Sequence, residues 1–250
     1  MICMGQSPAS YSTERLYLMK KLLLLFSVCA ATLATAQAQV RPGGALSSTD
    51  YPKGTTDSRN GGFGIKAGVN FADIRGADKK NYTNTENYTA FHAGFYSQFS
   101  FSEKFSLQPE ILYSRQGFKG GTPNNTSAET RRLDYLQVPV LLVYNFLDNV
   151  SIHIGPQVSL LTKVKEGDLD RKIANEQSSN GAYVYDYSYS SLDYGLAGGV
   201  EARVGPARIG GRYTAGLNDI IKDPRTTGAQ ALTNIKNGVF QVYVGVGINN

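Results

Sequence analysis

Charged side chains recur at even spacings within short segments of small and apolar residues. Arg208 and Arg212 lie four positions apart, while Lys66 and Glu110 each have apolar residues on both sides. Side chains two or four positions apart on an extended strand point to the same side. We therefore expect one enclosed surface to gather an ion-pair network, in which Glu110 balances Lys66. Its expected members are Lys66, Glu110, Glu201, Arg203, Arg208 and Arg212.

The spacing also predicts how the arginines are balanced. A two-residue turn at 205–206 would place Arg203 opposite Arg208 on the next strand. Like charges that face each other directly destabilise a strand pair, so an acid is needed between them. Glu201 would lie diagonally between Arg208 and Arg212, within reach of both, and it is the natural candidate for this acid.

The residue types of a serine hydrolase are also present. They are His92, Asp193 and either Ser190 or Ser191. A Ser–His–Asp set is defined by its geometry, which this sequence does not fix, and His92 is equally suited to a polar interior. His153 is expected at the end of its strand that adjoins a tight turn, far from His92. We therefore expect no catalytic site, no metal site and no cofactor.

Eight segments alternate apolar and polar residues with a period of two, which is typical of strands. They run over 62–73, 89–101, 104–116, 133–146, 150–163, 190–204, 207–218 and 239–249. The expected ionic residues lie on the polar face of these segments. The other face is apolar, and we expect it to contact lipid through residues that include Phe63, Ile65, Phe95, Val138, Leu196 and Val244.

The connections alternate between short and long. Tight turns are predicted at 102–103, 148–149 and 205–206, and long polar loops at 74–88, 117–132, 164–189 and 219–238. A spanning sheet must close on itself, because hydrocarbon cannot hydrogen-bond free strand edges. Strands of about ten residues with an apolar outside, a polar inside and long loops at one end are typical of outer-membrane barrels. The sequence predicts an all-β fold, an eight-stranded antiparallel up-and-down transmembrane β-barrel of OmpA/OmpX-like architecture.

The N-terminal part reads as a targeting segment. Lys20 and Lys21 precede an apolar run over 22–28 and an Ala-Thr-Ala sequence at 34–36, the pattern of a secretory signal peptide. We expect 1–36 to be an upstream extension plus signal peptide, with Met19 as the start, 37–61 to be a flexible periplasmic leader, and 62–250 to be the barrel. Both cysteines of the chain, Cys3 and Cys29, fall in the part expected to be removed.

Three segments resemble a known family. Residues 64–71, 107–114 and 133–140 are similar to the first, third and fourth strands of the PorT-like outer membrane β-barrel family of porin-family proteins. The resemblance extends over 62–250. It implies an eight-stranded barrel in a Gram-negative cell envelope, and one branch of the family is linked to a protein-secretion apparatus.

These observations favour an interaction protein. An eight-stranded barrel is just wide enough for its own side chains to fill, so no open channel is expected. We expect a monomer in outer-membrane lipid whose loops bind a protein or a glycan or support a surface or secretion assembly. Without residues 1–36, the net charge falls from +5 to +3 (22 − 19), which is too small and too scattered to predict nucleic-acid binding. Two alternatives stay open: a barrel-rim enzyme of the hydrolase or acyltransferase type, and a secreted soluble ligand-binding barrel.

Overall fold

The computed structural model describes residues 62–102, 104–122, 125–147, 149–174, 176–178, 180–185, 187–222 and 234–248. The expected signal peptide within 1–36 and the expected leader over 37–61 lie outside these residues, and so do one residue each of the expected turns at 102–103 and 148–149. Among the helices of the described part, none is long and apolar enough to cross a membrane.

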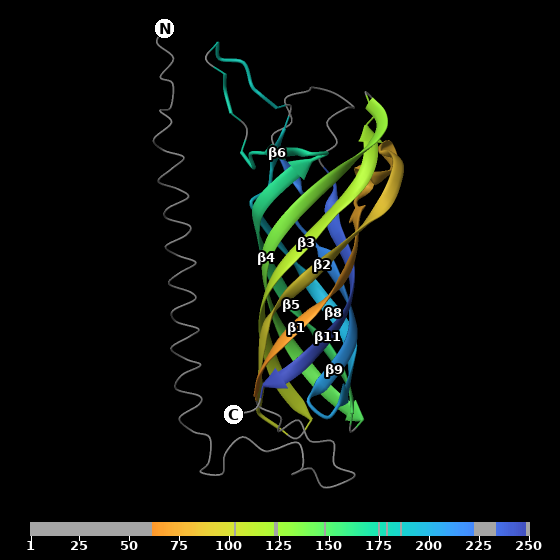
Figure 1. Cartoon of the computed structure of the whole chain (residues 1–250), viewed down its shortest axis with the longest axis vertical. Coiled ribbons are helices and arrows are strands. Elements are labelled where there is room, and N and C mark those ends of the chain that lie inside the picture. Colours follow the sequence, from red (N-terminus) through yellow and green to blue (C-terminus); the bar gives the residue numbers. More distant parts are fainter. Residues whose placement is uncertain are drawn as a thin grey trace. The chain divides into compact units, whose positions relative to one another are not determined.

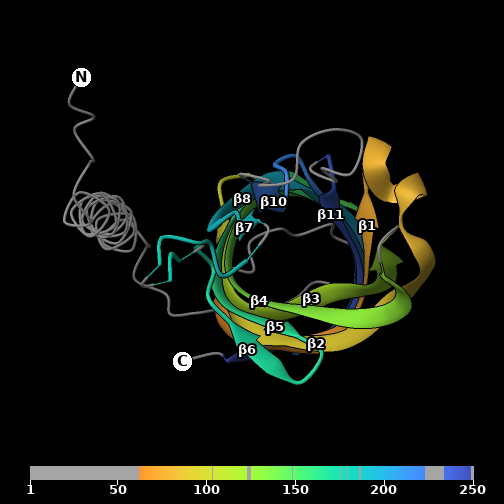
Figure 2. The same cartoon turned by 90° about the horizontal axis from the view of Figure 1, so that it is seen from above.

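Eight long antiparallel strands form a closed barrel, as the alternating segments predict. The first and last of them pair with each other, and the order of hydrogen-bonded neighbours returns to its starting strand. Figure 1 shows the tilted strands from the side, and Figure 2 shows the ring that they form along the barrel axis. The strands are β1 (Gly62–Arg75), β2 (Thr83–Ser100), β3 (Phe105–Thr122), β4 (Asn125–Leu147), β5 (Val150–Glu166), β8 (Leu192–Val204), β9 (Ala207–Gly216) and β11 (Lys236–Ile248).

The short elements belong to connections at one end of the barrel, which we call the loop end. They are the 3-10 helix η1 (Ala77–Asn81) and the strands β6 (Leu169–Arg171), β7 (Ser188–Tyr189) and β10 (Ile221–Lys222). β6 adds to the sheet beside β5, and β7 pairs with β10. At the opposite end, the turn end, two residues connect β8 to β9, since Val204 pairs with Ala207.

Two of the predicted loops are largely strand. β3 runs to Thr122 and β4 begins at Asn125, so the predicted loop over 117–132 is wrong and the chain forms a long hairpin there. In the same way, β2 already begins at Thr83, inside the predicted loop 74–88. The reason is that the outward side chains beyond the membrane need not be apolar. The hydrogen-bonded ladder continues past the apolar band, but the alternation of apolar and polar residues from which strands were predicted ends there.

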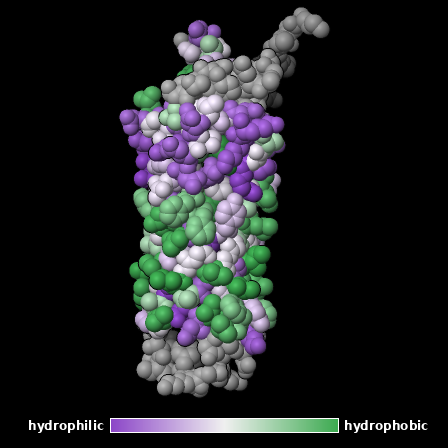
Figure 3. Space-filling model, turned by 90° about the vertical axis from the view of Figure 1, so that its right-hand side faces the viewer, coloured by the Kyte–Doolittle hydropathy of each residue, from purple (hydrophilic) through white to green (hydrophobic). Residues whose placement is uncertain are grey.

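The interior changes character along the barrel axis. Towards the turn end it is polar, as predicted, but at the loop end it holds a cluster of buried hydrophobic side chains that we call the apolar plug. A polar interior throughout is therefore wrong. The outer surface is hydrophilic at this end (Figure 3), so the ordinary rule of a soluble core, apolar inside, applies to these strands. The apolar plug consists of Ile74, Tyr82, Phe118, Leu133, Tyr135, Leu161, Val164, Tyr189, Ile220, Ile221 and Ile235.

The outer wall carries an exposed apolar band. Figure 3 shows a broad hydrophobic zone on one side of the barrel, with a hydrophilic zone between it and the loop end. Phe63, Ile65, Phe95, Leu196 and Val244 are exposed on this wall, and Val138 is partly exposed. Aromatic rings contact one another near the edges of the band, among them Phe91 with Tyr113 and Phe101 with Phe105.

Two glycines make room for large rings inside the barrel. Gly64 pairs with Tyr96 across β1 and β2, and Gly210 pairs with Tyr243 across β9 and β11. A Cβ atom on Gly64 would lie 2.3 Å from the Tyr96 ring, and one on Gly210 would lie 2.4 Å from the Tyr243 hydroxyl oxygen. Both rings therefore lie against backbone that has no side chain, which fixes their positions in the lumen.

Candidate functional site

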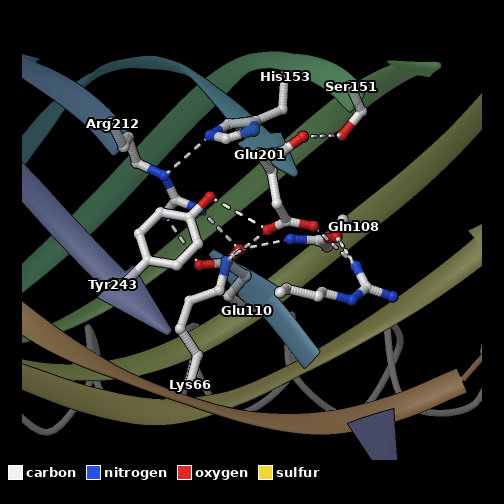
Figure 4. Close-up of polar contacts among 9 residues, drawn as sticks. Lys66, Gln108, Glu110, Ser151, His153, Glu201, Arg212 and Tyr243 are labelled. Carbon is white, nitrogen blue, oxygen red and sulfur yellow. Dashed lines mark hydrogen bonds and ion pairs between the residues drawn. The ribbon is translucent and has the colours of Figure 1, made fainter. Parts of the chain in front are cut away.

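Glu110 is at the centre of a buried ionic network in the polar half of the lumen. Its carboxylate accepts two hydrogen bonds from Arg212, Nη1 to Oε2 at 2.8 Å and Nη2 to Oε1 at 2.7 Å. Lys66 donates to Glu110 Oε1 at 2.8 Å, and all three side chains are buried (Figure 4). Paired, charge-assisted hydrogen bonds of this kind are among the strongest in proteins.

Glu201 forms the second half of this network. It accepts hydrogen bonds from Arg208 and from the Tyr243 hydroxyl, each at 3.1 Å. Lys66 Nζ lies 3.6 Å from its Oε2 atom and 4.0 Å from the centroid of the Tyr243 ring. One ammonium group thus lies between two carboxylates and over an aromatic face, where its charge is well compensated.

The pairing of Arg212 differs from the sequence prediction. Glu201 lies diagonally between Arg208 and Arg212 in the predicted register, and it pairs with Arg208, but Arg212 contacts Glu110 on the opposite wall. The lumen of an eight-stranded barrel is narrow enough for side chains to meet across it, so adjacency along the sheet does not decide the partner. Arg203 pairs in register with Arg208, and its side chain is only partly buried.

Two further side chains, which were not among the predicted members, complete the network. Gln108 accepts a hydrogen bond from Arg208 at 3.2 Å and donates one to Glu110 at 2.7 Å. His153 Nε2 lies 3.3 Å from Arg212 Nε. Buried charges are tolerated when their remaining hydrogen-bonding positions are filled. The inward period-two positions already contained these residues, but nothing in the sequence said which of them meet.

The two histidines are closer than predicted. The rings of His92 and His153 lie 6.3 and 6.4 Å from the ring of Tyr243, so placing them at opposite ends of the barrel was wrong. The tilt of the strands brings positions of different height along their strands to one level. Within the described residues, no three His, Cys, Asp or Glu side chains gather into a group that could hold a metal ion.

The residues of the serine-hydrolase alternative do not assemble. Ser190 Oγ contacts Leu192 O and Asn218 Nδ2, and Asp193 accepts a hydrogen bond from Asn237 at 2.8 Å. His92 instead bonds Asn70 in the lumen, with 2.7 Å between Nδ1 and Oδ1. Ser191 is exposed. The geometry of a nucleophile beside a base, and a base beside an acid, is absent from these described residues.

A second cluster fastens the connection between β5 and β8 to the barrel. Arg171 donates to Glu166 Oε1 and to the Tyr187 carbonyl oxygen, both at 2.5 Å. The hydroxyls of Tyr187 and Tyr189 donate to the same Glu166 oxygen at 2.7 and 2.6 Å. The rings of Tyr185, Tyr187 and Tyr189 lie 4.4, 4.1 and 5.0 Å from the Arg171 guanidinium carbon. We call these five residues the tyrosine cluster.

The charge state of Glu166 is tied to this contact. Its partial burial by itself raises the pKa of the carboxyl group, but hydrogen bonds from Tyr189 and Tyr187 and the charge of Arg171 outweigh that effect. The pKa of Glu166 is therefore held below its usual value. The carboxylate form is the one that keeps the connection in place.

With the fold and the lumen described, the family can be stated. The family model for the outer membrane protein beta-barrel domain matches residues 37–222. The chain belongs to this family. The outer-membrane barrel is thus located in the cell outer membrane, as its exposed apolar band predicts. A search among curated proteins finds no match to this sequence.

Three solved structures of other proteins are similar to this chain at low sequence identity. Ail of Yersinia pestis, solved in complex with the heparin analogue sucrose octasulfate, is 15% identical; the match covers 75% of this chain and 99% of Ail, with a TM-score of 0.39. Neisserial surface protein A is 15% identical over 74% and 97% of the two chains, with a TM-score of 0.43. OprG of Pseudomonas aeruginosa is 17% identical over 76% and 97%, with a TM-score of 0.40.

Proposed function

We propose that this outer-membrane barrel is a non-enzymatic, monomeric scaffold that presents the connection between β5 and β8 to a protein or glycan partner at the cell surface. The observation that carries the proposal is the tyrosine cluster, which holds this connection in a defined position by means of Glu166 and Arg171. Binding residues are often found on loops that a rigid scaffold positions.

The filled lumen supports a scaffold rather than a pore. Lys66, Glu110 and Arg212 cross-link facing walls in the polar half. The apolar plug fills the loop end with buried side chains such as Phe118, Leu133 and Ile235. Two layers of different chemistry thus lie in series along the axis. A barrel closed in this way holds its loops still, and its function must lie on its surface.

The outer part of the β5–β8 connection is itself structured. Gln177 pairs with Tyr183 in an antiparallel bridge, and the Val184 amide donates to the Glu176 carbonyl oxygen at 2.8 Å. Tyr183 and Val184 are 45% and 53% exposed. We call these two residues the tip. Tyrosine is one of the residue types enriched at the centre of binding surfaces, and Val184 adds an exposed apolar side chain beside Tyr183.

The finer family assignment belongs to the same proposal. We infer that the chain is of the PorT-like branch, because residues 64–71, 107–114 and 133–140 resemble strands of that branch. This branch would make the partner a component of a surface or secretion assembly in a Gram-negative envelope. The exposed apolar band argues against the secreted soluble barrel, and the separated Ser190, His92 and Asp193 give no support to the rim enzyme.

Capture from intact envelopes tests the proposal. Purified wild-type barrel is compared with a variant carrying Tyr183→Ser and Val184→Ser, and with the control Leu169→Ser, an exposed apolar position in β6 of the same connection. We expect the tip variant to lose the captured partner and the control to retain it. Envelopes treated with proteinase distinguish a protein partner, which is lost, from a glycan, which remains. Equal capture by all three barrels would overturn the proposal.

A further inference from the structure

Four cationic side chains form one patch on the outer wall near the loop end. Cross-strand pairing places Arg115, Asp134 and Lys163 in one row over β3, β4 and β5. The next row towards the loop end contains Arg132, Lys165 and Asp170 over β4, β5 and β6. We call these six residues the basic patch. Four positive and two negative charges leave it with an excess of two positive charges.

Asp134 holds the two arginines of the basic patch in place. Arg132 binds it through two hydrogen bonds, Nε to Oδ1 at 3.0 Å and Nη2 to Oδ2 at 2.6 Å. Arg115 Nε donates to Oδ1 at 3.1 Å, and the Asp134 side chain is only 3% exposed. A buried acid thus fixes two guanidinium groups whose outer edges remain at the surface, which lowers the entropy lost when they bind a ligand.

The two lysines are open to solvent and share one acid. Lys163 and Lys165 are 46% and 30% exposed, and their Nζ atoms lie 2.9 and 3.4 Å from the two oxygens of Asp170. Asp170 is exposed, so these pairs contribute little to stability. The two ammonium groups are already brought together around one small anionic group.

The basic patch lies directly beyond the edge of the apolar band. Tyr113 and Leu136 lie two positions from Arg115 and Asp134 along their strands, on the same face and towards the turn end. They pair with each other and are exposed. The Arg115 guanidinium lies 4.9 Å from the centroid of the Phe91 ring, which contacts Tyr113. A step of two residues along a strand is about 7 Å. The charges therefore lie at the height of the lipid headgroups, immediately above the hydrocarbon.

We propose that the basic patch binds the phosphate groups of lipid headgroups in the outer leaflet of the outer membrane. Guanidinium groups match phosphate oxygens in geometry, and ammonium groups supply point charges. The leaflet follows from the proposed orientation, with the loop end outside the cell, but phosphate binding itself does not depend on it or on the partner of the tip. Asp170 competes with the phosphate for the lysines, while Asp134 does not, because it is buried under the arginines.

Native mass spectrometry of the purified barrel in detergent tests the inference. The probes are lipid A with both phosphates, the same lipid after enzymatic dephosphorylation, and inorganic phosphate alone. The variant Lys163→Gln with Lys165→Gln removes two charges of the basic patch. Its matched control, Lys79→Gln with Lys80→Gln, removes two charges from η1 in the β1–β2 connection at the same end of the barrel.

We expect the wild type to retain phosphorylated lipid A, and the patch variant, which lacks two lysines, to bind it roughly thirtyfold more weakly, since each lysine near a lipid surface contributes about 1 kcal/mol. The control binds as the wild type does, and Asp170→Asn binds more tightly. Retention of dephosphorylated lipid to the same extent, or equal weakening by both double variants, would overturn the inference. If inorganic phosphate bound as tightly as the lipid does, the proposal that a lipid headgroup supplies the bound phosphate would be overturned.

Discussion

At the scale of single residues, Glu110 and Glu201 neutralise different numbers of buried cations in the lumen. Glu110 accepts hydrogen bonds from Lys66, Arg212 and Gln108, whereas Glu201 accepts them from Arg208 and Tyr243. Loss of Glu110 therefore leaves two buried cations without their principal partner. Loss of Glu201 leaves one, because Lys66 keeps its closer contact with Glu110.

This difference gives a prediction for stability. We expect Glu110→Gln to destabilise the folded barrel by about 3–5 kcal/mol, the usual cost of breaking a buried pair. Glu201→Gln should cost less. The measurement is the fraction folded, from gel mobility without heating, as a function of urea concentration in detergent. Glu86→Gln is the control, since its pair with Lys119 is exposed. A larger loss from Glu201→Gln than from Glu110→Gln would refute this ranking.

The sequence revealed which residues face the lumen, but not whom each one contacts. Lys66, Glu110, Arg208 and Arg212 all occupy inward positions because alternation on a strand decides the face. Register across the 205–206 turn placed Arg203 opposite Arg208, since a two-residue turn leaves no freedom. The contact of Arg212 with Glu110 crosses the lumen and depends on the curvature of the whole sheet, which no local pattern encodes.

At the scale of elements, the chain follows two opposite rules in one set of strands. Within the apolar band, outward positions such as Phe95 and Val244 are hydrophobic and inward ones are polar. Towards the loop end the relation inverts, and inward positions such as Phe118 and Leu133 form the apolar plug. The eight strands were predictable because lipid imposes a strict alternation. The extensions of these strands past the apolar band were not predictable, because their glycine, threonine and charged residues show the composition of a loop.

The connection between β5 and β8 should respond to acid. The pKa of Glu166 is lowered in the folded state, so its carboxylate stabilises the docked connection above the unfolded value, and this contribution is lost as the pH falls through the folded value. We expect the connection to stay docked at neutral pH and to detach only in acid, at a pH below the ordinary glutamate pKa of about 4.3. Hydrogen–deuterium exchange over 167–189, corrected for the intrinsic rate at each pH, measures this.

Two variants separate this effect from general acid unfolding. Glu166→Gln should show fast exchange in the same segment already at neutral pH, with little further change in acid. Glu176→Gln removes a carboxylate from the exposed pair with Lys172 and should behave as the wild type does. Protection that persists in acid, or that survives Glu166→Gln, would show that the tyrosine cluster does not hold the connection.

At the scale of the whole molecule, the barrel is closed around its axis, and we propose that its side chains also close it along the axis. The ladder from β1 to β11 completes the ring, while the ionic network and the apolar plug lie in series inside it. We predict that the wild-type protein shows no steady conductance in planar lipid bilayers. Single-channel recording checks this, with an open porin as the positive control. A stable conductance in the nanosiemens range would contradict the filled lumen.

The seam between β1 and β11 makes the end of the chain decisive for its biogenesis. One edge of β1 stays unpaired until β11 is present. The two strands then pair in a ladder that begins at Phe63 and Ile248 and ends at Arg75 and Lys236. A truncated polypeptide without β11 would present two unpaired strand edges to hydrocarbon, which cannot satisfy them. We therefore expect insertion to require a completed chain, so that only barrels with both edges paired reach the hydrocarbon.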